Sequence, residues 1–141
     1  MPEHAVLVVE DDCALREALC DTLMVAGYEV RPAADGATAL NVLEREAVDL
    51  VVSDVQMQPM DGHALLGLIR ARQPNLPVIL MTAYGSEEIA VEAMKRGADD
   101  YIAKGRMQID ELEMRIARSL RRQNLETENV VLRQQLDTKF G

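Results

Sequence analysis

Chemically reactive side chains follow four separate apolar runs of the sequence. Carboxylates follow the first two runs, a hydroxyl the third and an ammonium the fourth: Glu10, Asp11 and Asp12; Asp54; Thr82; and Lys104. If these runs are parallel strands of one sheet, the groups meet at its carboxyl edge, where open sheets bind ligands. Two carboxylates about 4 Å apart repel by roughly 4 kcal/mol at an effective dielectric constant of about 20. Such a cluster needs raised pKa values or a bound cation, and ligand sets of oxygen alone favour Mg²⁺.

Magnesium beside a carboxylate favours phosphoryl chemistry, because the ion neutralises charge on the transferring oxygens. An aspartate can itself accept the phosphoryl group. Thr82 and Lys104 would then hold the remaining phosphoryl oxygens. Each residue taken alone is explained more simply as the end of a strand, but the four strand ends together favour a phosphoryl site.

Alternating strand and helix patterns must position these groups. Short apolar or β-branched runs predict strands at 5–9, 28–31, 48–53, 77–81 and 101–103. Leucine spacing and boundary residues predict helices between them, with caps at Asp35 and Ser86, ends at Gly27 and Gly97, and a last helix from Ile109. Runs that are apolar on both faces suit a parallel sheet covered by helices on both sides. We therefore predict an α/β, flavodoxin-like, five-stranded parallel sheet of order 2-1-3-4-5 with an extended C-terminal helix.

Composition restricts the function classes. The chain has 141 residues, a formal net charge of −9 and 48% hydrophobic residues, which indicates one globular domain and no direct contact with nucleic acid. No apolar run approaches the length of about 18 residues that a membrane helix needs, and no signal peptide is visible, so we expect a cytoplasmic protein. Cys13 and Cys20 lie too far apart on one predicted helix for a disulfide, and we expect two buried or half-buried thiols.

Six motifs taken together are specific. They are Val8-Val9-Glu10-Asp11-Asp12, Val51-Val52-Ser53-Asp54-Val55-Gln56-Met57, Met60-Asp61-Gly62, Leu80-Met81-Thr82-Ala83, Gly97-Ala98-Asp99-Asp100-Tyr101, and Lys104. Over about residues 5–120 the chain resembles the receiver (CheY-like) domain of two-component response regulators. The resemblance implies a phosphorylation-dependent signalling switch rather than an enzyme, with a sensor histidine kinase as its partner.

The resemblance also assigns the metal site. It implies that Asp54 is the phosphoacceptor and that Asp11 is the principal Mg²⁺ ligand, with Glu10 acting beside it directly or through water. The third protein contact to the metal would be the backbone carbonyl of Gln56.

The switch residues implied by the resemblance are Thr82, Lys104 and Tyr101. Thr82 would be the switch hydroxyl, Lys104 the phosphoryl-binding lysine and Tyr101 the aromatic side chain that changes position. The surface that responds would comprise helix 86–96, the last strand and the start of the last helix.

Two departures from the family pattern stand out. Gly105 follows Lys104 where the family usually has proline, so we expect a looser loop and a less firmly placed ammonium. Gln58 occupies the usual position of a proline, and Pro59 comes one residue later. We expect this second change to alter local shape and not the chemistry.

The C-terminal part predicts a linker. Leu125, Asn129, Leu132 and Leu136 follow a heptad pattern, so we divide the chain into a receiver domain, 1–122, and a helical or coiled-coil linker, 123–141. This segment resembles the linker of NtrC-type activators, which act on σ54 promoters through an AAA+ ATPase and a DNA-binding domain that these residues do not contain. Residues 76–85 are similar to receivers of flagellar regulators in that family. A homodimer through the switch surface or the C-terminal helix is expected, with the direction of its response to phosphorylation left open.

Two other classes compete with the switch. A Mg²⁺-dependent hydrolase could use an aspartate nucleophile, but Gln56 stands two residues after Asp54, where a carboxylic acid would be needed as general acid. A Rossmann-type nucleotide binder needs glycines after the first strand, where this sequence has acidic residues.

Overall fold

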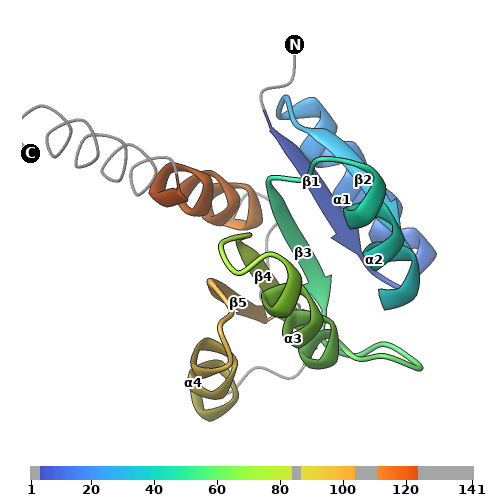
Figure 1. Cartoon of the computed structure of the whole chain (residues 1–141). Helices are drawn as coiled ribbons and strands as arrows, with labels where there is room; N and C mark the ends of the chain where they lie inside the picture. Colours follow the sequence, from blue (N-terminus) through green and yellow to red (C-terminus); the bar gives the residue numbers. More distant parts are fainter. Residues whose placement is uncertain (1–3, 84–86, 104–110, 124–141) are drawn as a thin grey trace, which may run out of the picture.

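Five parallel strands form a single sheet in the order β2-β1-β3-β4-β5 (Figure 1). The strands are β1 Ala5–Val9, β2 Glu29–Ala33, β3 Leu50–Asp54, β4 Val78–Thr82 and β5 Asp100–Ala103. In this computed structural model the described residues are 4–83, 87–103 and 111–123. The flavodoxin-like fold and strand order expected from the sequence are confirmed.

Helices fill the connections between the strands. They are α1 Cys13–Val25, α2 Gly36–Arg45, α3 Gly62–Arg72 and α4 Glu87–Lys95, and residues 111–123 are also helical. Three helices begin with an aspartate whose side chain accepts a hydrogen bond from a backbone N–H three residues later: Asp12, Asp35 and Asp61. Gly27 and Gly97 follow α1 and α4 with φ of +101° and +105°, the left-handed conformation that favours glycine at helix ends. The predicted cap at Asp35 and both glycine ends are confirmed.

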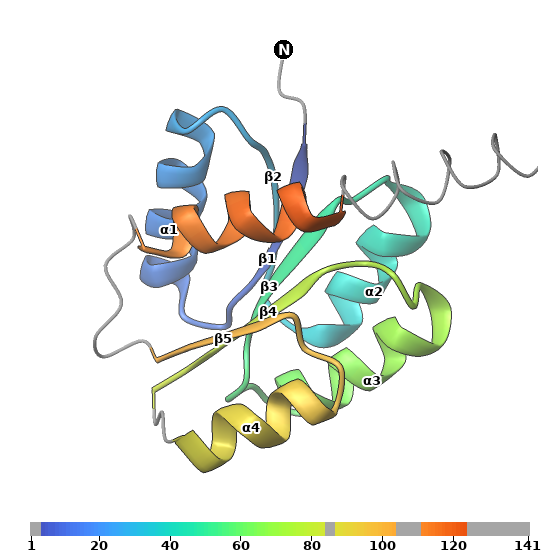
Figure 2. The same ribbon diagram turned by 90° about the vertical axis from the view of Figure 1, so that its left-hand side faces the viewer.

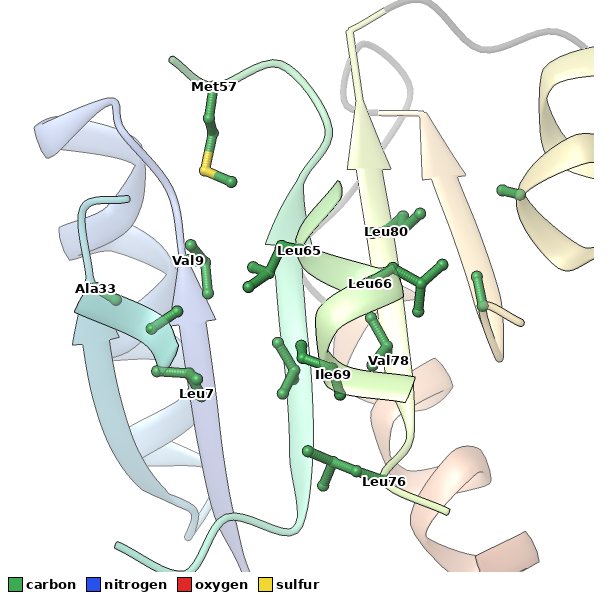
Figure 3. Packing of buried hydrophobic residues seen from close by; sticks show 14 residues of the cluster. Leu7, Val9, Ala33, Met57, Leu65, Leu66, Ile69, Leu76, Val78 and Leu80 are labelled. Carbon is green, nitrogen blue, oxygen red and sulfur yellow. The ribbon is translucent and has the colours of Figure 1, made fainter. Parts of the chain in front are cut away.

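The sheet separates two hydrophobic layers. On one face α2, α3 and α4 cover the strands, and on the other face α1 and the helical residues 111–123 do so (Figure 2). Leu65, Leu66 and Ile69 of α3 point at the sheet in the first layer (Figure 3). Residues alternate between the layers along each strand, so that Tyr101 packs against the first and Ile102 belongs to the second.

Three details differ from the sequence-based expectations. β2 runs through Pro32, which pairs with Val8, and does not stop before the proline. A proline is tolerated there because β2 is an edge strand and one side of it needs no donor. β3 begins at Leu50 and includes Asp54. Cys13 is exposed, since it opens α1, while Cys20 is half-buried; both thiols are free.

Several expectations fall outside the described residues. These are the cap at Ser86, the placement of Lys104 and Gly105, the helix start at Ile109 and the heptads from Leu125 to Leu136. The division at residue 122 therefore stays a prediction. Within the described ranges, no helix combines the length and the hydrophobicity needed to cross a lipid bilayer.

Candidate functional site

Three carboxylates meet at the carboxyl edge of the two central strands β1 and β3. Glu10 and Asp11 directly follow β1, and Asp54 is the last residue of β3; each offers an oxygen within 4.8 Å of the other two. Parallel pairing of Val9 with Ser53 brings these strand ends level. Glu10 is 0% exposed and Asp54 is 2% exposed, whereas Asp11 is open to solvent. The convergence expected from the sequence is therefore present.

The geometry of this acidic cluster suits a small divalent cation. Mg²⁺ binds oxygen at about 2.1 Å, so two ligands on opposite sides of it lie about 4.2 Å apart. At most one pair of three ligands can lie opposite each other, and neighbouring ligands lie about 3 Å apart, so three oxygens within 4.8 Å of one another would close by up to about 2 Å to share one ion. Without a cation, the three like charges repel one another, and solvent around the exposed Asp11 weakens that repulsion. A donor set of three carboxylates, one of them open to solvent, fits a cation that keeps part of its water shell.

Backbone hydrogen bonds hold Asp54 in place. The N–H of Val55 donates to the carbonyl of Met81 at 2.8 Å, which continues the sheet ladder past the strand end. The N–H of Gln56 donates to Oδ1 of Asp54 at 3.2 Å. The loop after β3 thus keeps the backbone of Gln56 beside the carboxylate of Asp54.

Gly62 lets α3 begin directly against the backbone of Asp54. A Cβ on Gly62 would overlap the carbonyl oxygen of Asp54 and would lie 2.8 Å from Cα of Val55. The N–H of Gly62 donates to the carbonyl of Val55 at 2.8 Å. Only a residue without a side chain fits this contact, so Gly62 helps to position Asp54 although it carries no reactive group.

Arg16 is a cation near the cluster that sequence reasoning missed. Its Nη1 donates to the backbone carbonyl of Glu10 at 2.8 Å, from one turn into α1. The contact fixes the chain at the point where it leaves β1. A basic residue four positions after the N-cap Asp12 was the available sequence signal, because that spacing returns the side chain towards the start of the helix.

A cavity of about 510 Å³ adjoins the site between α3, α4, β5 and the loop after β3. Its lining residues include the site residues Gln56, Thr82 and Tyr101. Thr82 ends β4 and is 3% exposed, while Tyr101 on β5 is half-buried. The structure therefore brings Thr82 and Tyr101 to one cavity, next to the loop that holds Asp54. His63 also lines the cavity and was not singled out from the sequence.

The predicted site residues thus fall into two adjoining groups. Glu10, Asp11 and Asp54 form the acidic cluster, and Thr82 and Tyr101 line the cavity. Gln56 belongs to both, since it contacts Asp54 and lines the cavity. Gln58 and Pro59 lie in the same loop, where the peptide bond between them is cis.

Comparisons with known proteins agree with this arrangement. Residues 6–117 match a family model described as the response regulator receiver domain. The chain is 62% identical to the response regulator protein FleR of Pseudomonas aeruginosa over 99 residues. These residues make up 70% of this chain and 21% of FleR. Over 137 residues it is 37% identical to the regulatory protein AtoC of Escherichia coli, covering 97% of this chain and 30% of AtoC. The chain therefore spans between about a fifth and a third of the length of these curated relatives.

Solved structures share the fold. NtrX from Brucella abortus superposes with a TM-score of 0.85 at 35% identity, covering 92% of this chain and 29% of the NtrX chain. The receiver domain of the Francisella response regulator 1452 superposes with a TM-score of 0.81 at 33% identity, covering 85% of this chain and 98% of that one. The second match covers nearly the whole of that receiver domain chain.

Proposed function

Because this chain belongs to the response regulator receiver domain family, we propose that it is a signalling switch that takes a phosphoryl group onto Asp54. The observation that carries the proposal is the convergence of Glu10, Asp11 and Asp54 within 4.8 Å at the carboxyl edge of the sheet. The family and the NtrC type of its relatives FleR, AtoC and NtrX agree with the motifs in the sequence.

Asp54 is the phosphoacceptor in this proposal. A carboxylate oxygen of Asp54 bonds to phosphorus as the bond from phosphorus to a histidine nitrogen of the sensor kinase breaks, and that nitrogen keeps the electron pair. The N–H of Gln56 orients the carboxylate through its hydrogen bond to Oδ1, and the packing of Gly62 holds the backbone behind it.

Glu10, Asp11 and Asp54 would hold Mg²⁺, together with the backbone carbonyl of Gln56. When bound, the ion supplies positive charge that offsets the charge on the phosphoryl oxygens. The protein's own part is to keep Glu10 and Asp54 buried, so that their charge is directed at the site and not dispersed in solvent.

Thr82 and Lys104 bind the remaining phosphoryl oxygens in this proposal. When the hydroxyl of Thr82 moves towards the phosphoryl group, it leaves space in the cavity, and Tyr101 changes position in response. Thr82 ends the strand next to that of Asp54, which supports its role. Lys104 directly follows β5 in the sequence.

The surface that reports the change comprises α4, β5 and the helical residues 111–123. Its exposed apolar side chains are Ile89, Val91, Met94 and Met114. Asp100 on β5 pairs with Arg115 at 2.6 Å and with Arg118 at 3.1 Å, so β5 and residues 111–123 respond together. We propose that a second copy of the chain docks here, through this surface, the C-terminal helix, or both.

Transcription control follows from the relatives. We propose that a cytoplasmic regulator of the NtrC type uses this domain to govern an AAA+ and DNA-binding effector on σ54 promoters, with residues 123–141 as the connecting helix. The similarity to FleR supports a flagellar role.

Phosphorylation is tested by incubating the chain with Mg²⁺ and a small phosphodonor and measuring the intact mass. The expected product is one phosphoryl adduct that is stable in acid and labile in base, lost in Asp54→Asn and after chelation of the metal. Asp21→Asn, at an exposed position on α1, is the matched control and keeps the adduct. Rapid multiple turnover of the phosphodonor would instead support the hydrolase. Nucleotide binding without Mg²⁺ would support the Rossmann-type binder.

Dimerisation is tested by light scattering with and without a phosphoryl mimic bound at Asp54. A change in mass that Met94→Glu abolishes and Met24→Glu leaves intact supports docking at the α4 surface, since Met24 is similarly exposed but lies on α1. A mass that stays constant contradicts the proposed oligomeric switch.

A further inference from the structure

Two residues that line the cavity beside Thr82 each carry a polar atom that lacks a hydrogen-bond partner among the residues the structure describes. They are Nδ1 of His63 and the hydroxyl oxygen of Tyr101, and both atoms are buried. His63 and Tyr101 line the same cavity of about 510 Å³, His63 from α3 and Tyr101 from β5. A polar group buried without a partner costs free energy, so two such groups on residues that line one cavity require an explanation.

The two groups are chemically complementary. A phenol hydroxyl both donates and accepts a hydrogen bond, and a neutral imidazole nitrogen does one or the other according to its tautomer. A single ordered water bridges such a pair when the cavity has room for it. The two atoms are not hydrogen-bonded to each other in this structure, so a change of side-chain rotamer is needed before each group satisfies the other, directly or through one water.

The remaining polar residues of the cavity are occupied or open to solvent. Arg96 pairs with Glu92 at 3.2 Å, and more than half of each side chain is exposed. Gln56 and Glu88 are also exposed. His63 and Tyr101 are thus the pair whose buried atoms remain to be matched, and they come from two different elements, α3 and β5.

His63 occupies a firmly held part of the molecule. It follows Gly62, whose backbone is packed against Asp54 and whose N–H donates to Val55 at 2.8 Å. The imidazole therefore projects from the segment that contacts the phosphoacceptor backbone. A hydrogen bond from this segment to β5 would tie Tyr101 to the acceptor loop.

We propose that His63 is the hydrogen-bond partner of the Tyr101 hydroxyl across this cavity and thereby acts as a positioning residue that favours the inward placement of Tyr101. The hydrogen bond itself does not depend on phosphorylation. Its consequence for switching rests on the proposed function.

The hydrogen bond is tested by NMR on the full chain with ¹⁵N-labelled histidine, at a pH about two units above the ordinary imidazole pKa of about 6.5. The chain has two histidines, so His4 serves as internal reference. Tyr101→Phe removes only the hydroxyl and is expected to shift the Nδ1 resonance of His63 and not that of His4. Tyr28→Phe is the matched control, because Tyr28 is also half-buried but packs on the other face of the sheet. An unmoved His63 resonance in Tyr101→Phe, or an equal shift in Tyr28→Phe, overturns the proposal.

The positioning role is tested with a phosphoryl mimic, by following the ring resonances of Tyr101 in three variants. His63→Leu is expected to lower the ratio of inward to outward Tyr101 about fivefold, the effect of one typical hydrogen bond. His63→Asn, which retains hydrogen-bonding groups, restores much of that ratio. In Tyr101→Phe the further change His63→Leu has no effect on the ring, and an undiminished effect there contradicts the proposal. If phosphorylation of Asp54 fails altogether, the histidine NMR result still stands, so the two failures are distinguishable.

Discussion

The two edges of the sheet use charged residues in opposite ways. At the amino edge, Arg70 of α3 donates to the carbonyl of Gly97 at 2.9 and 2.7 Å, to the carbonyl of Leu76, and to Asp99 at 2.7 Å. Asp99 in turn accepts the N–H of Val78 at 2.7 Å. At the carboxyl edge three carboxylates converge within 4.8 Å of one another. Opposite charges and donors meet at one edge, and like charges meet at the other.

The charged residues at the amino edge stabilise the fold, whereas the carboxylates at the carboxyl edge are kept together by the rest of the fold. The network around Arg70 joins α3 to the starts of β4 and β5, and its loss should weaken the protein. Repulsion within the acidic cluster lowers the stability of the folded state. The cluster forms nevertheless, because the strands and the loop after β3 place its carboxylates together. Four substitutions test this contrast, in order of decreasing effect.

Gly62→Ala should cause the largest loss of stability, because the new Cβ overlaps backbone atoms of Asp54 and Val55 that cannot move independently. We expect the free energy of unfolding to fall by about 3 kcal/mol in urea denaturation, with slower phosphorylation of Asp54. Gly67→Ala on the same helix is the control. A Cβ at Gly67 would have open space around it among the described residues, so this change should gain about 0.5–1 kcal/mol. Equal effects of the two changes would show that α3 is not packed against the acceptor as described.

Arg70→Met should lower the free energy of unfolding by about 2 kcal/mol, since Asp99 and two carbonyls lose their donor at a mostly buried position. Arg72→Met removes an ion pair with Glu44 in which both side chains are at least half exposed, and should change the stability by less than about 0.5 kcal/mol. Chemical denaturation of both variants makes the comparison. If Arg72→Met lowered the free energy of unfolding as much as Arg70→Met, the stabilising role of the Arg70 network at the amino edge would be contradicted.

Asp54→Asn should raise the free energy of unfolding by about 1 kcal/mol in the absence of divalent cations, because it relieves repulsion with Glu10 and Asp11. Saturating Mg²⁺ should stabilise the wild type more than the variant and so reduce or reverse the difference. Asp99→Asn, at the amino edge, should instead lower stability with or without Mg²⁺. Thermal unfolding of the wild type and the two variants, each with and without a chelator, measures all six conditions. Destabilisation by Asp54→Asn without metal would contradict the contrast between the edges.

Asp35 should give the smallest effect, through the pH dependence of α2. The backbone N–H of Thr38 donates to Asp35 at 2.7 Å and lowers the pKa of this carboxyl below its ordinary value. A lowered pKa in the folded state means that its contribution is present above the unfolded pKa and is lost as the pH falls through the folded value. Asp35→Ala should therefore reduce stability at neutral pH, and the difference from the wild type should shrink in acid. Asp35→Asn retains a capping oxygen and should remove the pH dependence with a smaller loss at neutral pH.

Sequence patterns predicted the elements whose signals are local. All five strands, the cap at Asp35 and the glycine ends of α1 and α4 follow from apolar runs and boundary residues. The end of β2 was missed because Pro32 interrupts a strand pattern, and only the position of β2 at the sheet edge makes the proline acceptable. Likewise, the exposure of Cys13 depends on its place at the first turn of α1.

The functional site likewise contains residues that the sequence could place and residues that it could not. Glu10, Asp11, Asp54 and Thr82 could be placed together because parallel strands bring their ends to one edge. Gly62 belonged to a motif but had no predicted role, and Arg70 and His63 were not singled out, since the importance of all three arises from contacts with residues distant in the sequence. The role of a single polar or small residue cannot be read from its sequence neighbours, because it depends on the residues that it contacts in the folded structure.

The proline in β2 has a consequence for how copies of this chain can associate. An exposed strand edge invites another chain to extend the sheet, which leads to aggregation. β2 offers charged residues and a proline without an N–H donor, and β5 has only four residues, with Asp100 engaged by arginines. Strand-to-strand growth is discouraged at both sides of the sheet, so any association of copies of this chain would use contacts between helices.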